Sequence, residues 1–247
     1  MSRIRQPEFG LRTFAVTTRM TSMLPPQSAE WAQLIYATQG SLTVECPVGQ
    51  QLWYIPARRA LWAPAGEACT LRMRGVVCLR MIYLHESLSK QAQATQAINV
   101  SPLLHEAILE AVRRSVLSGT EPLSRLIMEL LSAASSVPLM LPMPHDARAL
   151  RAAKQLLRIP AKQDTLPDLA KSSGASVRTL ERLFTVETGM GFAAWRQRLR
   201  MLEGMRLLMD GQSVADAADA TGYESVSAFV VAFKATVGET PGRWLRY

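Results

Sequence analysis

The chain has 247 residues, enough for two domains with separate hydrophobic cores. Its 28 lysines and arginines against 20 aspartates and glutamates give a formal net charge of +8. This balance attracts polyanions in general and does not choose between nucleic acid and a membrane surface. No apolar run reaches the 18 or more residues that a membrane-spanning helix needs, and no signal-peptide pattern opens the sequence. We therefore expect no membrane partner.

Cysteine usage indicates the redox compartment. Cys46, Cys69 and Cys78 are an odd number and lack the paired spacing of a metal site. Such usage is typical of a reducing cytosol rather than of a disulfide framework. We therefore expect a cytoplasmic protein.

Residues 1–85 are predicted to form a β-domain. Short apolar runs alternate with turns that contain glycine or proline, as in a sandwich or barrel. The expected strands are 31–37, 41–46, 52–55, 71–73 and 76–83. The interior of a barrel can hold a small ligand. Large aromatic side chains either fill the core or line such a site, and the candidates are Trp31, Tyr36, Trp53, Tyr54 and Trp62.

Residues 86–136 are predicted to contain two amphipathic helices. Ser101-Pro102 opens one and Glu121-Pro122 the other, because proline is favoured in the first turn of a helix. Their apolar faces either pack on the β-domain or form a homodimer, and periodicity does not decide between the two. Residues 137–145, with three prolines, are predicted to be a linker.

A helix-turn-helix pattern occurs twice in the last hundred residues. In each copy a hydroxyl residue followed three positions later by aspartate resembles a capping box, which begins a helix. A glycine then ends this helix, and a serine caps the next one. The corresponding pairs are Thr165 and Ser213, Asp168 and Asp216, Gly174 and Gly222, and Ser176 and Ser225. The predicted domain spans 146–247, with its two units at about 165–186 and 213–236.

The second helix of the first unit is predicted to read DNA. Leu180 and Phe184 lie on an apolar stripe, so Arg178 and Arg182 face away from the core. A helix fits the major groove, where arginine can donate two hydrogen bonds to guanine. We therefore expect double-stranded DNA as partner, with a helix over about 195–209 that holds the two readers in a fixed relation.

These residues resemble the AraC/XylS family of transcriptional regulators over about 146–247. The resemblance implies about seven helices, with two recognition helices in adjacent major grooves. The implied DNA-binding residues are Arg178, Glu181, Arg182, Thr185, Ser225, Ser227 and Val231, with Lys234 and Arg243 as phosphate contacts. The matching signature is Gly222-Tyr223-x-Ser225-x-Ser227-x-Phe229-x-x-x-Phe233-Lys234-x-x-x-Gly238-x-Thr240-Pro241-x-x-Trp244.

The chain departs from the family pattern at two places. Leu245 stands where the arginine after the terminal aromatic is usual, and Arg246 follows one place later. Val230 and Val231 make the second recognition helix less polar than the first. We therefore expect stronger base discrimination from the first.

The β-domain resembles the cupin-type sensor domains found before such regulators. Relatives carry histidines where this chain has Gln27, Ala29 and Cys69. One thiol and one amide fall short of the three or four ligands that a divalent metal requires, so no metal and no cofactor are expected. His85, His105 and His145 lie outside the expected strands and are interpreted as surface residues.

The whole pattern predicts an α+β protein of two domains, a cupin-like barrel with helices followed by an all-α DNA-binding domain. The leading interpretation is a transcriptional regulator, associated with the nucleoid, that responds to a small-molecule effector, contacts RNA polymerase and activates neighbouring genes. An enzyme that uses the barrel is the alternative, although no catalytic constellation supports it. An architectural DNA-binding protein is the third hypothesis.

Overall fold

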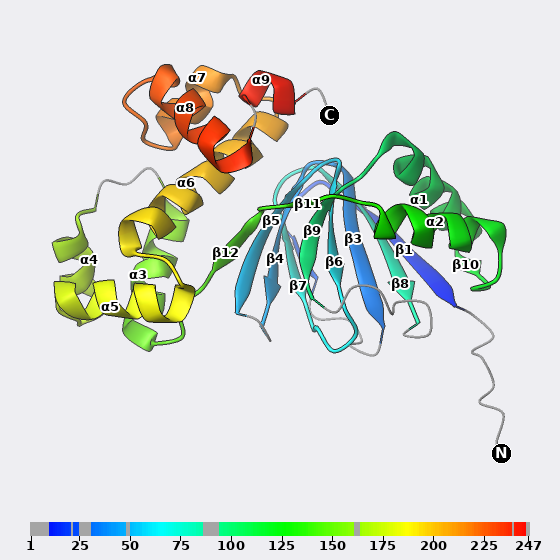
Figure 1. Cartoon of the computed structure of the whole chain (residues 1–247), viewed down its shortest axis with the longest axis horizontal. Helices are drawn as coiled ribbons and strands as arrows, with labels where there is room; N and C mark the ends of the chain where they lie inside the picture. Colours follow the sequence, from blue (N-terminus) through cyan, green and yellow to red (C-terminus); the bar gives the residue numbers. More distant parts are fainter. Residues whose placement is uncertain are drawn as a thin grey trace, which may run out of the picture. The chain divides into compact units, whose positions relative to one another are not determined.

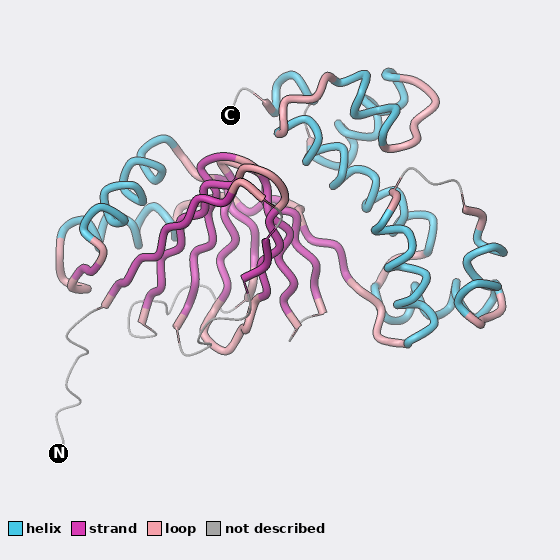
Figure 2. Tube along the Cα trace, turned by 180° about the vertical axis from the view of Figure 1, so that it is seen from behind, coloured by secondary structure: helices cyan, strands magenta, loops and turns pink. Residues whose placement is uncertain are grey.

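The computed structural model describes residues 10–20, 22–24, 31–47, 50–85, 94–160, 164–238 and 240–245. The chain divides into two compact units, Met1–Val48 with Ile55–Val137 and Gly49–Tyr54 with Pro138–Tyr247. Strands dominate the first unit and helices the second (Figure 2), which confirms the predicted α+β class. Within the described ranges, no helix is both long and apolar enough to cross a membrane.

Most strands of the first unit form one antiparallel sheet, in the order β10-β1-β8-β3-β6-β9-β11. In the second sheet β7 lies between β4 and β2. The strands predicted to form a barrel therefore lie in two sheets, and over the described ranges neither sheet closes on itself. The bounds are β1 Leu11–Thr18, β2 Ser22–Leu24, β3 Ala32–Gln39, β4 Ser41–Cys46, β6 Arg59–Ala63, β7 Thr70–Met73, β8 Val77–Leu84, β9 Gln96–Asn99, β10 Val116–Leu117 and β11 Ser136–Val137.

Strand β3 is central to the larger sheet and is buried on both faces. Side chains along a strand point alternately to opposite faces. Leu34 and Tyr36 belong to the core that the sheet shares with two helices. Gln33, one position away, has its side-chain amide hydrogen-bonded to the backbone carbonyl of Glu67. One face of β3 therefore packs against the core shared with the helices, and the other contacts the segment that contains Glu67.

Two helices, α1 (Pro102–Arg114) and α2 (Pro122–Ser132), pack on this sheet (Figure 1). The hydroxyl of Ser101 accepts a hydrogen bond from the backbone N–H of Leu104 and so caps α1. Ile108 and Ile127 are fully buried in the shared core. Packing on the sheet, one of the two alternatives left open by the sequence, accounts for these apolar faces.

The second unit combines seven described helices with a short strand pair. β12 pairs antiparallel with the first part of β5, where Met140 lies opposite Trp53 and Leu141 opposite Leu52. The segment predicted to be a linker, 137–145, therefore contains a strand. The bounds are β5 Gln51–Pro56, β12 Met140–Pro142, α3 Ala147–Arg158, α4 Leu166–Ser173, α5 Val177–Thr188, α6 Phe192–Met209, α7 Val214–Ala220, α8 Val226–Val237 and α9 Pro241–Trp244.

Candidate nucleic-acid interface

The two helix-turn-helix units, α4–α5 and α7–α8, begin their first helices in the same way. Thr165 and Asp168 form a complete capping box at α4, and Ser213 and Asp216 form one at α7. In each box the hydroxyl accepts the N–H of the aspartate, and the carboxylate accepts the N–H of the hydroxyl residue. These bonds satisfy N–H groups that a helix start otherwise leaves open.

The turns between the helices also match. Gly174 and Gly222 have φ angles of 73° and 75°, a left-handed conformation that favours glycine. Ser176 and Ser225 then cap α5 and α8 by accepting the N–H groups of Thr179 and Ala228. The turn that sets the angle between the two helices is therefore specified locally in both units.

The cores of the two units repeat one aromatic contact. The rings of Phe184 and Trp195 lie 5.1 Å apart with their planes at 68°, and the rings of Phe233 and Trp244 lie 5.5 Å apart at 69°. Such edge-on pairs add to the stabilisation from burial. Helices α5 and α8 are thus each anchored by a buried phenylalanine that packs against a tryptophan later in the chain.

Helix α6 joins the two helix-turn-helix units. It starts at Phe192, three residues before the predicted start. Its 18 residues span about 27 Å at 1.5 Å per residue. Its arginines hold neighbouring segments of the same unit: Arg196 donates to the carbonyl of Asp164, Arg198 to that of Met140 and Arg200 to that of Pro160. Burial lowers the pKa of Arg196 and of Arg198.

The exposed face of α5 carries Arg178, Glu181, Arg182 and Thr185, as predicted for a reading helix. Over the described ranges, the structure gives Arg178 and Arg182 no hydrogen bond and no ion pair within the protein. The hydroxyl of Thr185 donates to the carbonyl of Glu181 one turn earlier, so its lone pairs remain able to accept. Two guanidinium groups on one helix face are thus presented to solvent.

The exposed face of α8 is less polar. Val231 is 70% exposed, and Ser227 and Lys234 are exposed beside it. The hydroxyl of Ser225 caps α8, so a structural role accounts for this serine. Arg243 is exposed on α9. All nine residues predicted to contact DNA therefore lie at the surface of the second unit.

The predicted ligand-binding aromatics occupy three different environments. Tyr36 and Trp62 share the core between the larger sheet and helices α1 and α2, where Tyr36 is hydrogen-bonded to His105 at 2.7 Å. Trp31 packs edge-on against His85, 5.2 Å between ring centroids. The indole of Trp53 donates to the side chain of Gln51, next to it on β5.

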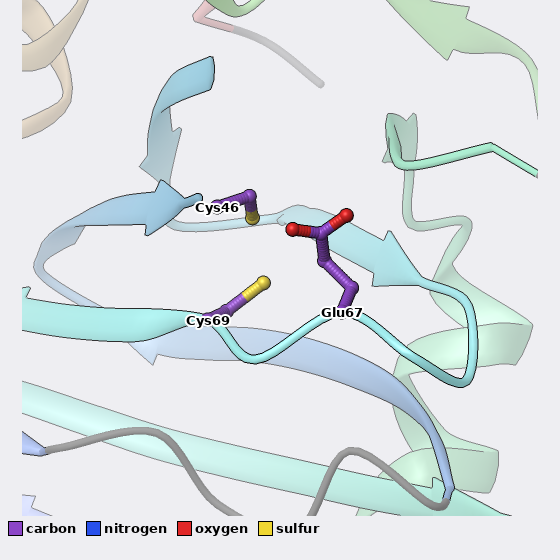
Figure 3. Close-up of side chains that lie close together, drawn as sticks. All are labelled: Cys46, Glu67 and Cys69. Carbon is purple, nitrogen blue, oxygen red and sulfur yellow. The ribbon is translucent and has the colours of Figure 1, made fainter. Parts of the chain in front are cut away.

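The structure also brings together three residues that the sequence analysis did not connect. The sulfur atoms of Cys46 and Cys69 and the carboxylate of Glu67 point toward one another (Figure 3). The expected absence of a metal rested on Cys69 and Gln27, and both Gln27 and Ala29 lie outside the described residues. The spacing Glu67-x-Cys69 is a local signal, but Cys46 is joined to it only by strand pairing.

Comparison with known proteins assigns the second unit independently. Residues 169–247 match the family model described as a helix-turn-helix domain. The chain is 30% identical over 235 residues to the HTH-type transcriptional regulator NimR of Escherichia coli (strain K12), covering 94% of this chain and 85% of that protein. It is 36% identical over 93 residues to a putative AraC-like transcription regulator of Streptomyces lividans, covering 37% of this chain and 31% of that protein.

A solved structure with similar coverage is that of ToxT from Vibrio cholerae O395. It is 14% identical, covers 96% of this chain and 97% of its own, and superimposes with a TM-score of 0.42. The relationship to NimR extends over most of both chains, and the residues that match the helix-turn-helix model contain both aromatic pairs and the capping box of α7. The chain belongs to the AraC/XylS family of helix-turn-helix transcriptional regulators.

Proposed function

We propose that this regulator binds specific DNA sequences by placing α5 and α8 in neighbouring major grooves, with α5 as the main reader. Arg178, Glu181, Arg182 and Thr185 contact base edges from α5. Ser227 and Val231 make weaker or apolar contacts from α8, and Lys234 and Arg243 contact phosphates. The observation that carries this proposal is the exposed pair of guanidinium groups on α5, in a chain that belongs to a family of transcriptional regulators.

The contrast with α6 supports this assignment. Four arginines of α6 have bonds within the fold, including the ion pair of Arg206 with Glu203 at 2.7 Å. Arg178 and Arg182 belong to the same unit but hold no such partner over the described ranges. Guanidinium groups that bind phosphate or guanine must be available at the surface. The arginines of α5 meet this requirement.

The test is a footprint on the DNA upstream of the chain's own gene, combined with two variants. We expect protection over about two turns of duplex per subunit, because recognition helices in successive grooves are spaced by one turn, about 34 Å. Arg182→Ala should weaken specific binding by about 1 to 3 kcal/mol while nonspecific binding changes little. Full specific binding by both Arg178→Ala and Arg182→Ala would contradict the proposal.

The first unit is proposed to sense a small-molecule effector, and the chain to act with RNA polymerase as an activator of neighbouring genes. Tyr36 and Trp62 are the aromatics that share one core with α1 and α2, so an effector that enters there would contact both. Trp31 of the first unit is retained as a further candidate for effector contact, and so is Trp53, although Trp53 belongs to the second unit. The test is tryptophan fluorescence and transcription from the footprinted promoter, with and without candidate compounds.

Three further predictions belong to this proposal. The chain is proposed to act in the cytoplasm on the nucleoid and to have no catalytic activity, since membership of a family of transcriptional regulators accounts for its two-unit architecture without an enzyme reaction. A homodimer through α1 and α2 is the remaining assembly hypothesis; Leu103 of α1 is 54% exposed. Sedimentation of the full chain with and without the footprinted DNA tests this hypothesis.

A further inference from the structure

Cys46, Glu67 and Cys69 form a buried cluster of metal-ligating groups in the first unit. One ligand atom from each residue, the two Sγ atoms and a carboxylate oxygen, lies within 4.8 Å of the others. The residues are 1%, 8% and 0% exposed, respectively. Figure 3 shows the three side chains converging from two segments of the chain. Among the residues that the structure describes, this is the one group of three or more histidine, cysteine, aspartate or glutamate side chains that is placed to hold a metal ion.

The backbone fixes this convergence. Strands β4 and β7 are antiparallel and pair Glu45 with Thr70, so the same register places Cys46 opposite Cys69. Residues directly opposite on paired strands have neighbouring side chains. Cys46 ends β4, and Cys69 immediately precedes β7. The two sulfur atoms are therefore held together by the sheet.

The carboxylate comes from the turn between β6 and β7. The N–H of Glu67 donates to the carbonyl of Pro64, and Gly66 has a φ of 98°, which only glycine adopts without strain. The side-chain amide of buried Gln33 donates to the carbonyl of Glu67 at 3.3 Å. These bonds hold the turn so that Glu67, two residues before Cys69, faces the same space.

We propose that Cys46, Cys69 and Glu67 bind one divalent cation of the zinc class. Two sulfur ligands and one carboxylate suit zinc, whereas magnesium and calcium prefer ligand sets made of oxygen alone. In a tetrahedral zinc site two thiolate sulfurs lie about 3.8 Å apart, given Zn–S bonds of about 2.3 Å. The observed upper limit of 4.8 Å requires only a small contraction. The fourth position is left for water or an exogenous ligand.

Proton release accompanies binding at this site. Binding replaces the proton on each sulfur by a bond to the metal, and the two protons pass to solvent. Gln33 has a buried Oε1 without a hydrogen-bond partner over the described ranges, an acceptor beside the turn that carries Glu67.

This proposal goes beyond DNA recognition and does not depend on it. All three of its ligands lie in the first unit, whereas the proposed DNA contacts lie in the second. Cobalt serves as the probe, because coordinated thiolates give it a charge-transfer absorption that oxygen ligands do not. The reduced full-length protein, freed of metal with a chelator, is titrated with Co²⁺ and then with Zn²⁺.

We expect one equivalent of Co²⁺ to bind with thiolate charge-transfer absorption, and one equivalent of Zn²⁺ to displace it. Cys46→Ser and Cys69→Ser should abolish the signal, and Glu67→Gln should weaken binding by roughly tenfold or more, since even residues behind the ligands contribute 10- to 100-fold. Cys78→Ser is the matched control and should bind normally, because Cys78 lies in β8, where its thiol contacts Gln39.

A measurement on the unaltered protein guards against variants that fail to fold. X-ray absorption of the zinc-loaded chain should show two sulfur ligands and one or two oxygen ligands. A coordination shell without sulfur, or normal cobalt binding by Cys46→Ser or Cys69→Ser, would overturn the proposal. So would a Cys46–Cys69 disulfide, detected by mass spectrometry, in protein purified without reductant.

Discussion

Gly204 of α6 lies against the ring of Phe229 in α8. A methyl group at position 204 would come within 2.7 Å of Cε2 and 2.9 Å of Cζ of this ring. Phe229 is fully buried and packs against Tyr223 and Phe233, with ring centroids 5.4 and 5.8 Å away. The ring therefore cannot move aside without disturbing its neighbours. The absence of a side chain at Gly204 sets how closely α6 approaches α8.

Gly204→Ala should consequently destabilise the protein and displace α8. In an exposed helix this change would stabilise by about 1 kcal/mol through helix propensity, but overpacking a dense core costs about 1 to 3 kcal/mol. We expect a net loss of stability in urea unfolding and weaker protection of the half-site contacted by α8. Gly242→Ala is the control, because a methyl group there meets no atom within 4 Å. Equal stability of the two variants would contradict the packing argument.

A second prediction concerns the bond between Trp195 and β12. The indole Nε1 of Trp195 donates to the carbonyl of Pro142 at 2.6 Å, and Trp195 is fully buried. Trp195→Phe preserves an aromatic ring against Phe184 but leaves this carbonyl without its donor. Loss of one partner of a buried hydrogen bond costs about 1 to 3 kcal/mol. Urea unfolding should show a loss in this range, and an unchanged midpoint would show that β12 is not held by this bond.

The helical unit was largely predictable from sequence because its signals are local. The capping pairs at Thr165 and Ser213 and the glycines after α4 and α7 fix helix ends within a few residues. The start of α6 was misplaced by three residues because Gly191 caps it without a side-chain hydrogen bond. No sequence pattern marked that end.

The β-unit was predictable only in part. β6, Arg59–Ala63, is buried throughout and so lacks the alternation that identifies a half-exposed strand. The prolines of 137–145 favoured a linker, yet Met140–Pro142 form a strand beside β5. The cluster of Cys46 with Cys69 depends on the register between β4 and β7, which joins residues 23 positions apart and cannot be derived from spacing.

A third prediction uses the matched caps of α4 and α7. Thr165→Ala and Ser213→Ala each remove a hydroxyl that accepts a helix N–H, which should cost about 0.5 to 2 kcal/mol in urea unfolding. Ser227→Ala is the control for stability, because Ser227 is exposed within α8 and caps nothing. The three variants thus separate two effects: the caps should change stability, and Ser227 should change only DNA affinity. A cap variant as stable as Ser227→Ala would argue against the capping boxes.

A fourth prediction distinguishes phosphate contacts from base contacts. Lys234 is exposed on α8. If it binds a phosphate, Lys234→Ala should weaken binding to all sequences alike and should reduce the slope of log affinity against log salt by about one. Fluorescence anisotropy over a salt series, with specific and unrelated duplexes, measures both quantities. An unchanged slope would remove Lys234 from the proposed phosphate contacts.

A fifth prediction concerns alkaline pH and Tyr36. Burial raises the pKa of Tyr36 from its ordinary value of 10.0 to about 12; the positive charges of Arg58 and Arg59 lower this pKa by less, and the negative charge of Glu106 raises it further. Below pH 10 the phenol is protonated in both the folded and the unfolded chain, so the stabilisation that depends on this proton is fully present. Above pH 10 only the unfolded chain loses this proton, so the free energy of unfolding should fall as the pH rises toward about 12.

Urea unfolding between pH 9 and about 11.5 tests this dependence, with Tyr36→Phe as the comparison. The variant loses the hydrogen bond to His105 and should be less stable at pH 9, by about 0.5 to 1.5 kcal/mol. Its stability should nevertheless fall less steeply with pH, because it has no phenol to ionise at this position. Burial also raises the pKa of Tyr83 and of Tyr223, so a residual decline is expected in the variant. Parallel declines in the two proteins would show that Tyr36 ionises as readily in the folded chain as in the unfolded one.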